Sequence, residues 1–221
     1  MSYAYTTTSS AGGMTQNYSY ANGTFAGSAA VALTISTTTG GVTSSSVSYY
    51  NPSTGASLGA TPDPTAVITF DPPNYQDLIN NAFYNVGQIA TVAVKARMTG
   101  SQITSAFAAI GGGTALTMDY SYRIERKPNE SVTVPAGTFA NTCKLQIDVT
   151  VSNVKLEGND GSNPLYTSLF GTLSSVFTAP FKNTVWLTSA LPNVPKFYAE
   201  TTGLAAGSAT QVLTSYSLAA R

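Results

Sequence analysis

The chain of 221 residues contains no histidine and a single cysteine, Cys143. Without histidine, the Ser-His-Asp and Cys-His arrangements of nucleophilic enzymes cannot form, and most zinc sites are excluded. One cysteine cannot form an intramolecular disulfide. No run of about 18 apolar residues is present, so the sequence predicts no transmembrane helix.

Charge is also scarce. Charged residues make up only 9% of the chain, against about 25% in ordinary soluble domains. The ten basic and ten acidic residues cancel, and residues 1–62 carry no charge at all. Binding to nucleic acid or to an anionic membrane needs clustered Lys and Arg, so the composition predicts neither partner.

Alternation of apolar and polar residues dominates what remains. Four stretches show it, namely 31–35, 120–125, 143–151 and 212–218. A period of two with one apolar face is typical of half-buried antiparallel strands. Turn clusters rich in Gly and Asn separate these stretches.

We find no long linker and no internal repeat, and therefore predict a single domain over 1–221. A charge-free, Ser/Thr-rich β segment (1–62) is expected to continue into a core of residues 63–221. The alternative for 1–62 is a disordered Ser/Thr linker. Apolar residues such as Val31, Leu33 and Ile35 favour strands.

Two stretches have helical features. The first is 74–87, where Asn74 follows two prolines and could cap a helix that Gly87 ends. The second is 163–180, with Asn163 as cap and a proline in the first turn. Its apolar residues fall on one helical face: Leu165, Leu169, Leu173, Val176 and Phe177, widened by Phe170.

The second helix must bury this apolar stripe, and the concave side of a curved sheet is the available partner. We therefore predict a mainly β fold, an antiparallel and strongly curved sheet (half-barrel or open barrel) with one or two short helices, one of them packed on the concave face. The same helix could be a fixed plug or a lid that lifts for an apolar ligand. The tract 99–118 is ambiguous, but its three consecutive glycines suggest a hairpin loop between two strands.

The stretch SVTVPAGTFANTCKLQIDV (131–149) reads as two strands joined by a sharp turn. Pro135 at the second position of that turn and Gly137 at the fourth favour a type I turn with a positive φ at the glycine. Such a loop would pair Val134 with Thr138.

Strict alternation from that pairing would bury Lys144 and expose Leu145, which is too costly. The sequence therefore predicts a bulge within 139–142 that restores the apolar face. Cys143 then shares its face with Leu145 while Lys144 points away. We predict a small buried core residue there, in preference to a reactive thiol activated by the neighbouring lysine.

The same residues carry a resemblance. The segment ESVTVPAGTF with the following CK, which includes Pro135, Gly137, Phe139 and Cys143, resembles the hairpin of a loose set of exported bacterial domains of unknown function. In this chain one more residue separates Phe139 from the next strand than in those domains.

Two further segments resemble that family, FDPPNYQDLINNAFYNVGQ (70–88) and NTVWLTSALPNVPKFYAETTG (183–203), so that the resemblance spans 65–218. In the second segment, LTSALPNVP replaces a tighter loop. The resemblance implies a curved antiparallel sheet similar to the half-barrel of bacterial lipoprotein carriers, which hold acyl chains under a helical lid. It implies no catalytic residue.

No catalytic, cofactor or metal site stands out elsewhere. The acidic residues are scattered, so no carboxylate pair suited to glycoside hydrolysis is expected. The Gly-rich loop 157–163 is faintly similar to a calcium loop, but we predict a plain polar turn in preference to a metal site.

Three functions therefore remain. The first is a non-catalytic exported protein that binds a lipid or another apolar or amphipathic ligand in a curved sheet. The alternatives are a structural module that contacts other proteins of the cell envelope, without a small ligand, and an enzyme. The Ser/Thr-rich, Lys-poor composition resembles that of a mature exported bacterial protein. We accordingly expect a location in the periplasm or cell envelope, with a signal sequence that is not part of this chain.

Overall fold

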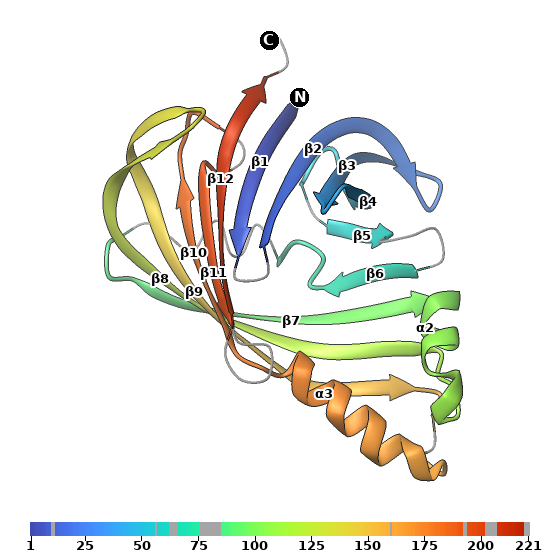
Figure 1. The fold of residues 1–221 in the computed structure, drawn as a ribbon. Coiled ribbons are helices and arrows are strands. Elements are labelled where there is room, and N and C mark those ends of the chain that lie inside the picture. Colours follow the sequence, from blue (N-terminus) through green and yellow to red (C-terminus); the bar gives the residue numbers. More distant parts are fainter. Residues whose placement is uncertain are drawn as a thin grey trace.

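The computed structural model describes residues 1–9, 12–55, 57–61, 66–75, 85–159, 161–191, 194–201 and 207–218. Within them, twelve antiparallel strands close into a barrel (Figure 1). Each strand pairs with the next along the chain, and β1 (Ser2–Ser9) also pairs with β12 (Gly207–Ser217). The predicted antiparallel curved sheet is confirmed, and its curvature goes as far as closure.

The remaining strands follow in chain order. They are β2 (Gly12–Phe25), β3 (Ser28–Thr39), β4 (Val42–Tyr50), β5 (Ser57–Thr61), β6 (Ala66–Asp71), β7 (Ile89–Gly100), β8 (Ala115–Val134), β9 (Gly137–Glu157), β10 (Phe181–Leu187) and β11 (Lys196–Thr201). The charge-free segment thus forms β1 to β5, and the linker alternative for it is wrong. Thr and Tyr, which favour strands, are frequent there.

The inner face of the barrel is defined by side chains that share one side of the sheet. Residues paired across neighbouring strands point to the same side. From Ile147, this side is followed through Ile124 on β8 and Ala90 on β7 in one direction, and through Asn183 on β10 in the other. A buried cluster occupies it: Val92, Val94, Ile124, Leu145, Ile147 and Val149. The alternation in 120–125 and 143–151 predicted strands with one buried face, and the inner face of β8 and β9 confirms it.

The ambiguous tract between β7 and β8 is helical, and the predicted hairpin with strands on both sides is wrong. It forms α2 (Ser101–Ala106) and the short helix η1 (Ala108–Ile110). Ile103, Phe107 and Ile110 are all buried. Their spacing of four and three residues is that of a helix face, and they cover inner-face residues at the ends of β7, β8 and β9.

The helical segment predicted at 163–180 is present as η2 (Tyr166–Phe170) and α3 (Gly171–Phe177), beside the end of β9 (Figure 1). Asn163 caps it, because its Oδ1 accepts a hydrogen bond from the Leu165 backbone nitrogen at 2.9 Å. Phe170 is 6% exposed and packs among inner-face residues of β7 to β9. One helix therefore does pack on the concave side of the sheet.

Burial of the whole predicted stripe is wrong at two positions. Leu165 and Leu169 are 52% and 47% exposed. The cause is that η2 is a π-helix, whose hydrogen bonds join residues five apart instead of four. The wider turn places Phe170, not Leu169, on the sheet. The side chains of Leu173, Val176 and Phe177 lie outside the described part of the structure.

The helix predicted at 74–87 falls mostly on 76–84, which lie outside the described residues. Before that gap, Tyr75 is buried and its ring lies 4.8 Å from the ring of Phe70 and 6.3 Å from that of Tyr122. The connection between β6 and β7 therefore sends an aromatic side chain onto the inner face.

The turn between β8 and β9 is tighter than predicted. Val134 pairs with Gly137, and Pro135 and Ala136 form a two-residue loop. The predicted pairing of Val134 with Thr138 is wrong, because Thr138 pairs with Thr133. The predicted positive φ at Gly137 is confirmed at 137°.

The predicted bulge within 139–142 is also confirmed. The register shifts there, and Asn141 has a φ of 54°. A second shift on β8, between Lys127 and Glu130, compensates it. With one extra residue on each strand, both strands turn over together. By strand parity, the buried residues of the hairpin tip, such as Phe139, therefore lie on the same side of the sheet as the outer face of the barrel wall. The prediction that the bulge keeps Val132 and Val134 on the same face as Leu145 is wrong.

Replacing Gly137 with Val is expected to lower the free energy of unfolding by about 1–3 kcal/mol, because a φ of 137° is reserved for glycine. No atom lies within 4 Å of the position that a Cβ would occupy, so the cost is backbone strain alone. Urea unfolding followed by circular dichroism measures it. Thr138→Val, at an exposed neighbouring position, should change stability by at most about 0.5 kcal/mol.

Candidate ligand-binding interior of the barrel

Tyrosines line the inner face where the barrel closes. Phe197 on β11 pairs with Gln211 on β12, and Gln211 pairs with Thr7 on β1, so all three side chains lie on the inner face. Tyr3 and Tyr5 share it with Thr7 and are only 1% and 2% exposed. Their rings pack edge to face on those of β2, with centroids 6.1 Å apart for Tyr3 and Tyr20 and 4.9 Å apart for Tyr5 and Tyr18.

Two glutamines join these rings into a polar network. The Gln211 amide nitrogen donates to Gln16 Oε1 at 2.5 Å and to the Tyr18 hydroxyl at 3.2 Å. The Gln16 amide in turn donates to Thr37 Oγ1 at 3.2 Å, and Thr7 Oγ1 donates to Gln16 Oε1 at 3.3 Å. This part of the inner face offers neutral hydrogen-bonding groups and no charge.

The tyrosine hydroxyls stay protonated at neutral pH. Burial, followed by the charges of Tyr50, Tyr3 and Tyr18, raises the pKa of Tyr20 to about 12. Burial is also the first cause that raises the pKa of Tyr5. These groups can donate and accept hydrogen bonds, but a phenolate base or nucleophile is disfavoured.

The β6–β9 part of the inner face is apolar. Beside the buried aliphatic cluster, an aromatic row runs from Phe70 over Tyr75 to Tyr122 and Tyr120, with 5.9 Å between the last two rings. Phe70, Tyr120 and Tyr122 remain partly exposed, as do Tyr18 and Tyr20. The inner face therefore combines an apolar wall with a tyrosine and glutamine wall, and solvent reaches side chains of both.

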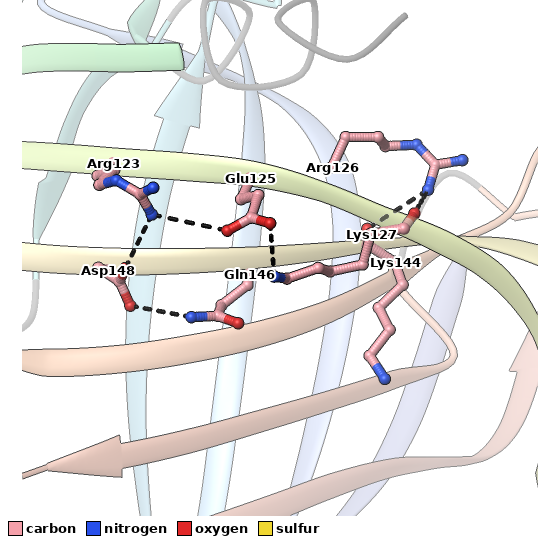
Figure 2. A network of polar contacts seen from close by, with 7 residues as sticks. All are labelled: Arg123, Glu125, Arg126, Lys127, Lys144, Gln146 and Asp148. Carbon is pink, nitrogen blue, oxygen red and sulfur yellow. Dashed lines mark hydrogen bonds and ion pairs between the residues drawn. The ribbon is translucent and has the colours of Figure 1, made fainter. Parts of the chain in front are cut away.

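Arg126 places a positive charge on this face. It follows Ile124 by two positions on β8 and is 8% exposed. Its guanidinium donates to the backbone oxygens of Lys127 and Lys144 and to Asn129 Oδ1. Figure 2 shows its side chain extending away from the charged ladder formed by Arg123 and its neighbours.

Cys143 lies close to this guanidinium. It packs against the inner-face cluster and is half-buried, so full burial, as predicted, is not reached. Burial raises the pKa of the Cys143 thiol, while the positive charge of Arg126 acts in the opposite direction. The net shift is upward, which disfavours the thiolate that a nucleophile would need.

The outer face of β8 to β10 carries the charges. Arg123 pairs with Asp148 and Glu125 at 3.4 and 3.7 Å, and Lys127 pairs with Glu125 at 2.6 Å (Figure 2). Gln146 donates to Asp148 at 3.4 Å. Arg123–Asp148 joins β8 to β9, and the other two ion pairs lie along β8; all are exposed or half-exposed pairs, each of which stabilises a fold by about 0–1 kcal/mol. They describe a solvated sheet surface and not a catalytic site.

A second outer-face cluster surrounds Trp186, the single tryptophan. Its indole nitrogen donates to Glu130 Oε1 at 2.5 Å, and Lys144 and Lys196 lie 5.3 and 4.7 Å from its ring centroid. Trp186 is 6% exposed and packs with Val132, Val134 and Phe139 of the hairpin tip, in a cluster that also includes Tyr3, Tyr5 and Leu213 where the barrel closes. The cluster fastens the turned-over hairpin to the barrel wall.

The hydrogen bond to Trp186 is the first cause that lowers the pKa of Glu130, followed by the bond and charge of Lys144. Because the pKa of Glu130 is lowered in the folded state, its ionised carboxylate stabilises the fold at pH values above its ordinary pKa of 4.5. This contribution is lost as the pH falls through the folded-state pKa. Trp186 fluorescence should therefore change in acid, below pH 4.5. In Glu130→Gln this transition should disappear; its persistence would assign it to another group.

Grooves on the outer surface offer little selectivity for a charged ligand. One of about 520 Å³ spans β6 to β9 and is lined by three basic and three acidic side chains, Lys95, Arg97, Lys155, Asp71, Asp119 and Glu157. Arg97 is already paired with Glu157 at 2.7 Å. Since the charges cancel, the groove has no net field that would attract an ion.

Ser152 and Lys155 have the spacing of a Ser-x-x-Lys motif, a signal for a serine nucleophile. Both are exposed on β9, and no hydrogen bond joins their side chains. A nucleophile needs its base within hydrogen-bond reach. Among the described residues, no group of three or more Cys, Asp or Glu lies close enough together to hold a metal ion.

The predicted site residues fall into two places. The hairpin residues Pro135, Gly137 and Phe139 build the tip, and Cys143 lies beyond the bulge on the inner face. Of the helical residues, Phe170 is brought to the inner side of the sheet. Arg126 and the tyrosine wall were missed, because they are recognised only when the register shows which side of each strand faces inward. Across the described part of the chain, helices are too short or too polar to span a bilayer.

No family model and no curated protein matches the sequence. Among solved structures, the chain is similar to a protein named as exported, with a YmcC-like fold, from Bacteroides fragilis; the TM-score is 0.50 and the identity 11%, over 97% of this chain and 93% of that one. It is also similar to the hypothetical lipoprotein YmcC from Escherichia coli, with a TM-score of 0.45 and 10% identity, over 99% of this chain and 85% of that one. At such identities the first likeness shows the fold alone, and the second carries no argument.

Proposed function

We propose that this protein binds a lipid or another amphipathic molecule inside its barrel, without catalysing a reaction. The observation that carries the proposal is the inner face. Roughly eight strands suffice for side chains to fill a barrel interior, and larger barrels leave room for ligands. In this twelve-stranded barrel, inner-face rings such as Tyr20 and Tyr122 remain partly exposed.

The chemistry of the two walls fits a molecule with an apolar chain and polar groups. Acyl chains would pack on the partly exposed rings of Phe70, Tyr120 and Tyr122, while the hydroxyls and amides near Gln16 and Gln211 would satisfy polar atoms. Ligand sites in proteins are mostly apolar with a few convergent polar groups. The absence of histidine from the chain supports a binding role over an enzymatic one.

We also propose an extracytoplasmic location. The solved structure of similar fold from Bacteroides fragilis is named as that of an exported protein. The VPAGTF hairpin resembles that of exported domains, and the resemblance to lipoprotein carriers points to the same class of ligand. In this proposal α2, η1 and η2 cover one end of the interior, with Phe107 and Phe170 as their anchors, 6.1 Å apart.

Cys143 provides the test, because it is the single cysteine and lies on the inner face. In the folded protein a maleimide should react with it more slowly than in urea, since the thiol is half-buried and burial raises its pKa. Dodecanoate or dodecanol should slow the reaction further by occupying the interior. Mass spectrometry of the labelled chain follows the rate.

The control is Thr150→Cys in a chain that carries Cys143→Ala, because Thr150 is exposed on the outer face. Its labelling rate should not respond to either ligand. If Cys143 is equally unresponsive, and no lipid co-purifies with the protein from its native envelope, the structural module without a small ligand replaces this proposal.

A further inference from the structure

The arginines of β7 and β8 differ in how their charge is balanced. Arg97 pairs with Glu157, and Arg123 pairs with Asp148 and Glu125, all on the solvated outer face. Arg126 is far more buried, and among the described residues no carboxylate lies within ion-pair distance of it. Burial of a charge is costly unless it meets an opposite charge or strong hydrogen bonds.

The neutral partners of Arg126 hold it in place without neutralising it. Its three hydrogen bonds go to two backbone oxygens and to the Asn129 amide, which in turn donates to Asn141 at 2.7 Å. A guanidinium has five N–H donors, so at least two find no acceptor in the described part of the protein. The planar group retains capacity for an anion, which arginine binds through paired hydrogen bonds.

The position of Arg126 places this capacity next to the apolar wall. Ile124, two residues before it on β8, is fully buried on the inner face. On the neighbouring strand, Cys143 of the same face feels the guanidinium charge. Tyr122, four residues before Arg126 on the same face of β8, is partly exposed. A ligand chain that packs on the Tyr122 ring would therefore bring a polar group at its end close to Arg126.

We propose that Arg126 binds the anionic headgroup, a carboxylate or a phosphate, of a single-chain lipid whose tail lies along the inner face of the barrel. This assignment rests on the proposed lipid-binding function and names the ligand class. The anionic headgroup would be the counter-ion of Arg126, for which no described carboxylate lies within ion-pair distance. A solely structural role, in which Arg126 staples the bulges through Asn129, predicts no such preference for anions.

The experiment compares three ligands of equal chain length, dodecanoate, dodecyl phosphate and dodecanol, by isothermal titration of the delipidated full chain. The two anions should bind at least about tenfold more tightly than the alcohol, since close charge pairs at interfaces couple by about 1.5 kcal/mol or more. Arg126→Met should abolish this preference while leaving dodecanol affinity within about threefold. Arg123→Met, which removes an outer-face arginine, is the matched control and should keep the preference.

Acetate and inorganic phosphate separate the sources of the anion. Neither should bind measurably in the absence of a chain; if phosphate alone binds as tightly as dodecyl phosphate, the site is one for a free anion and the lipid assignment is overturned. Equal binding of all three dodecyl ligands, or an unchanged preference in Arg126→Met, also overturns it but leaves the lipid-binding function standing. Failure of every dodecyl ligand to bind removes that function itself.

A measurement on the unmodified protein covers the case in which Arg126→Met does not fold. A carboxylate beside Arg126 neutralises the charge that Cys143 feels, so dodecanoate should shift the pH dependence of maleimide labelling to higher pH more than dodecanol does. An equal shift with both ligands would contradict the assignment.

Discussion

Truncation of Phe170 to Ala is expected to lower the free energy of unfolding by about 3–5 kcal/mol, the usual cost of removing a buried aromatic ring. Phe170 is 6% exposed and joins the helical segment to the sheet. Its ring stacks on Tyr166 at 5.0 Å and meets Phe107 edge to face at 6.1 Å. Without it, η2 loses its buried contact with the inner side of the sheet. Urea unfolding monitored by circular dichroism gives the change.

Leu169→Ala is the matched control, because Leu169 precedes Phe170 directly and is 47% exposed. This variant should alter stability by at most about 0.5 kcal/mol. An ordinary α-helical stripe would give the opposite ranking, with Leu169 on the buried face. If Leu169→Ala is as damaging as Phe170→Ala, the π-helical register of this segment is wrong.

The strands could be predicted from the sequence because their cause is local. Alternation in 143–151 and 120–125 is a direct record of one buried and one solvated face. Closure of the barrel could not be predicted, because it depends on the pairing of β1 with β12, which lie at opposite ends of the chain. No local pattern records a contact between Tyr5 and Leu213.

Helices were harder to place. Residues 101–110 were read as part of a hairpin because three glycines follow them, although Ile103, Phe107 and Ile110 have helical spacing. Gly111, with a φ of 98°, ends η1 instead of forming a hairpin loop. For η2, the helix and its cap could be predicted, but a π-helical turn leaves no clear mark in the sequence and moves the buried residue from 169 to 170.

The candidate site was the least predictable part. Arg126 looks in the sequence like one more charge in the alternating run that includes Arg123 and Glu125. Its inward position follows from the parity of β8 before the bulge, and the hairpin residues beyond that bulge turn the other way. Counting alternate faces along 131–149 predicted the bulge in 139–142 correctly. This count could not show that β8 has a compensating bulge, which decides which face the tip buries.

Trp186→Ala is the second substitution with a large expected effect, about 3–5 kcal/mol of lost stability. The reason is the reversed hairpin. Trp186 stands on the outer face of β10, opposite Lys144, and would be exposed on a simple barrel. It is buried because Val134 and Phe139 of the hairpin tip pack with it and because Glu130 accepts its indole hydrogen bond. Its loss should release the tip, which circular dichroism during urea unfolding would report together with faster amide exchange in 132–139.

Trp186→Phe separates the two contributions. The smaller ring keeps most of the apolar contact and loses the hydrogen bond to Glu130, so a cost of about 1–2 kcal/mol is expected, in line with the price of one charge-assisted bond. Amide exchange at 132–139 should then stay close to that of the unmodified protein. If Trp186→Ala costs less than 1 kcal/mol and leaves exchange at the tip unchanged, the hairpin does not rest on the outer face. The two bulges of β8 and β9 would then need another explanation than the turning over of both strands.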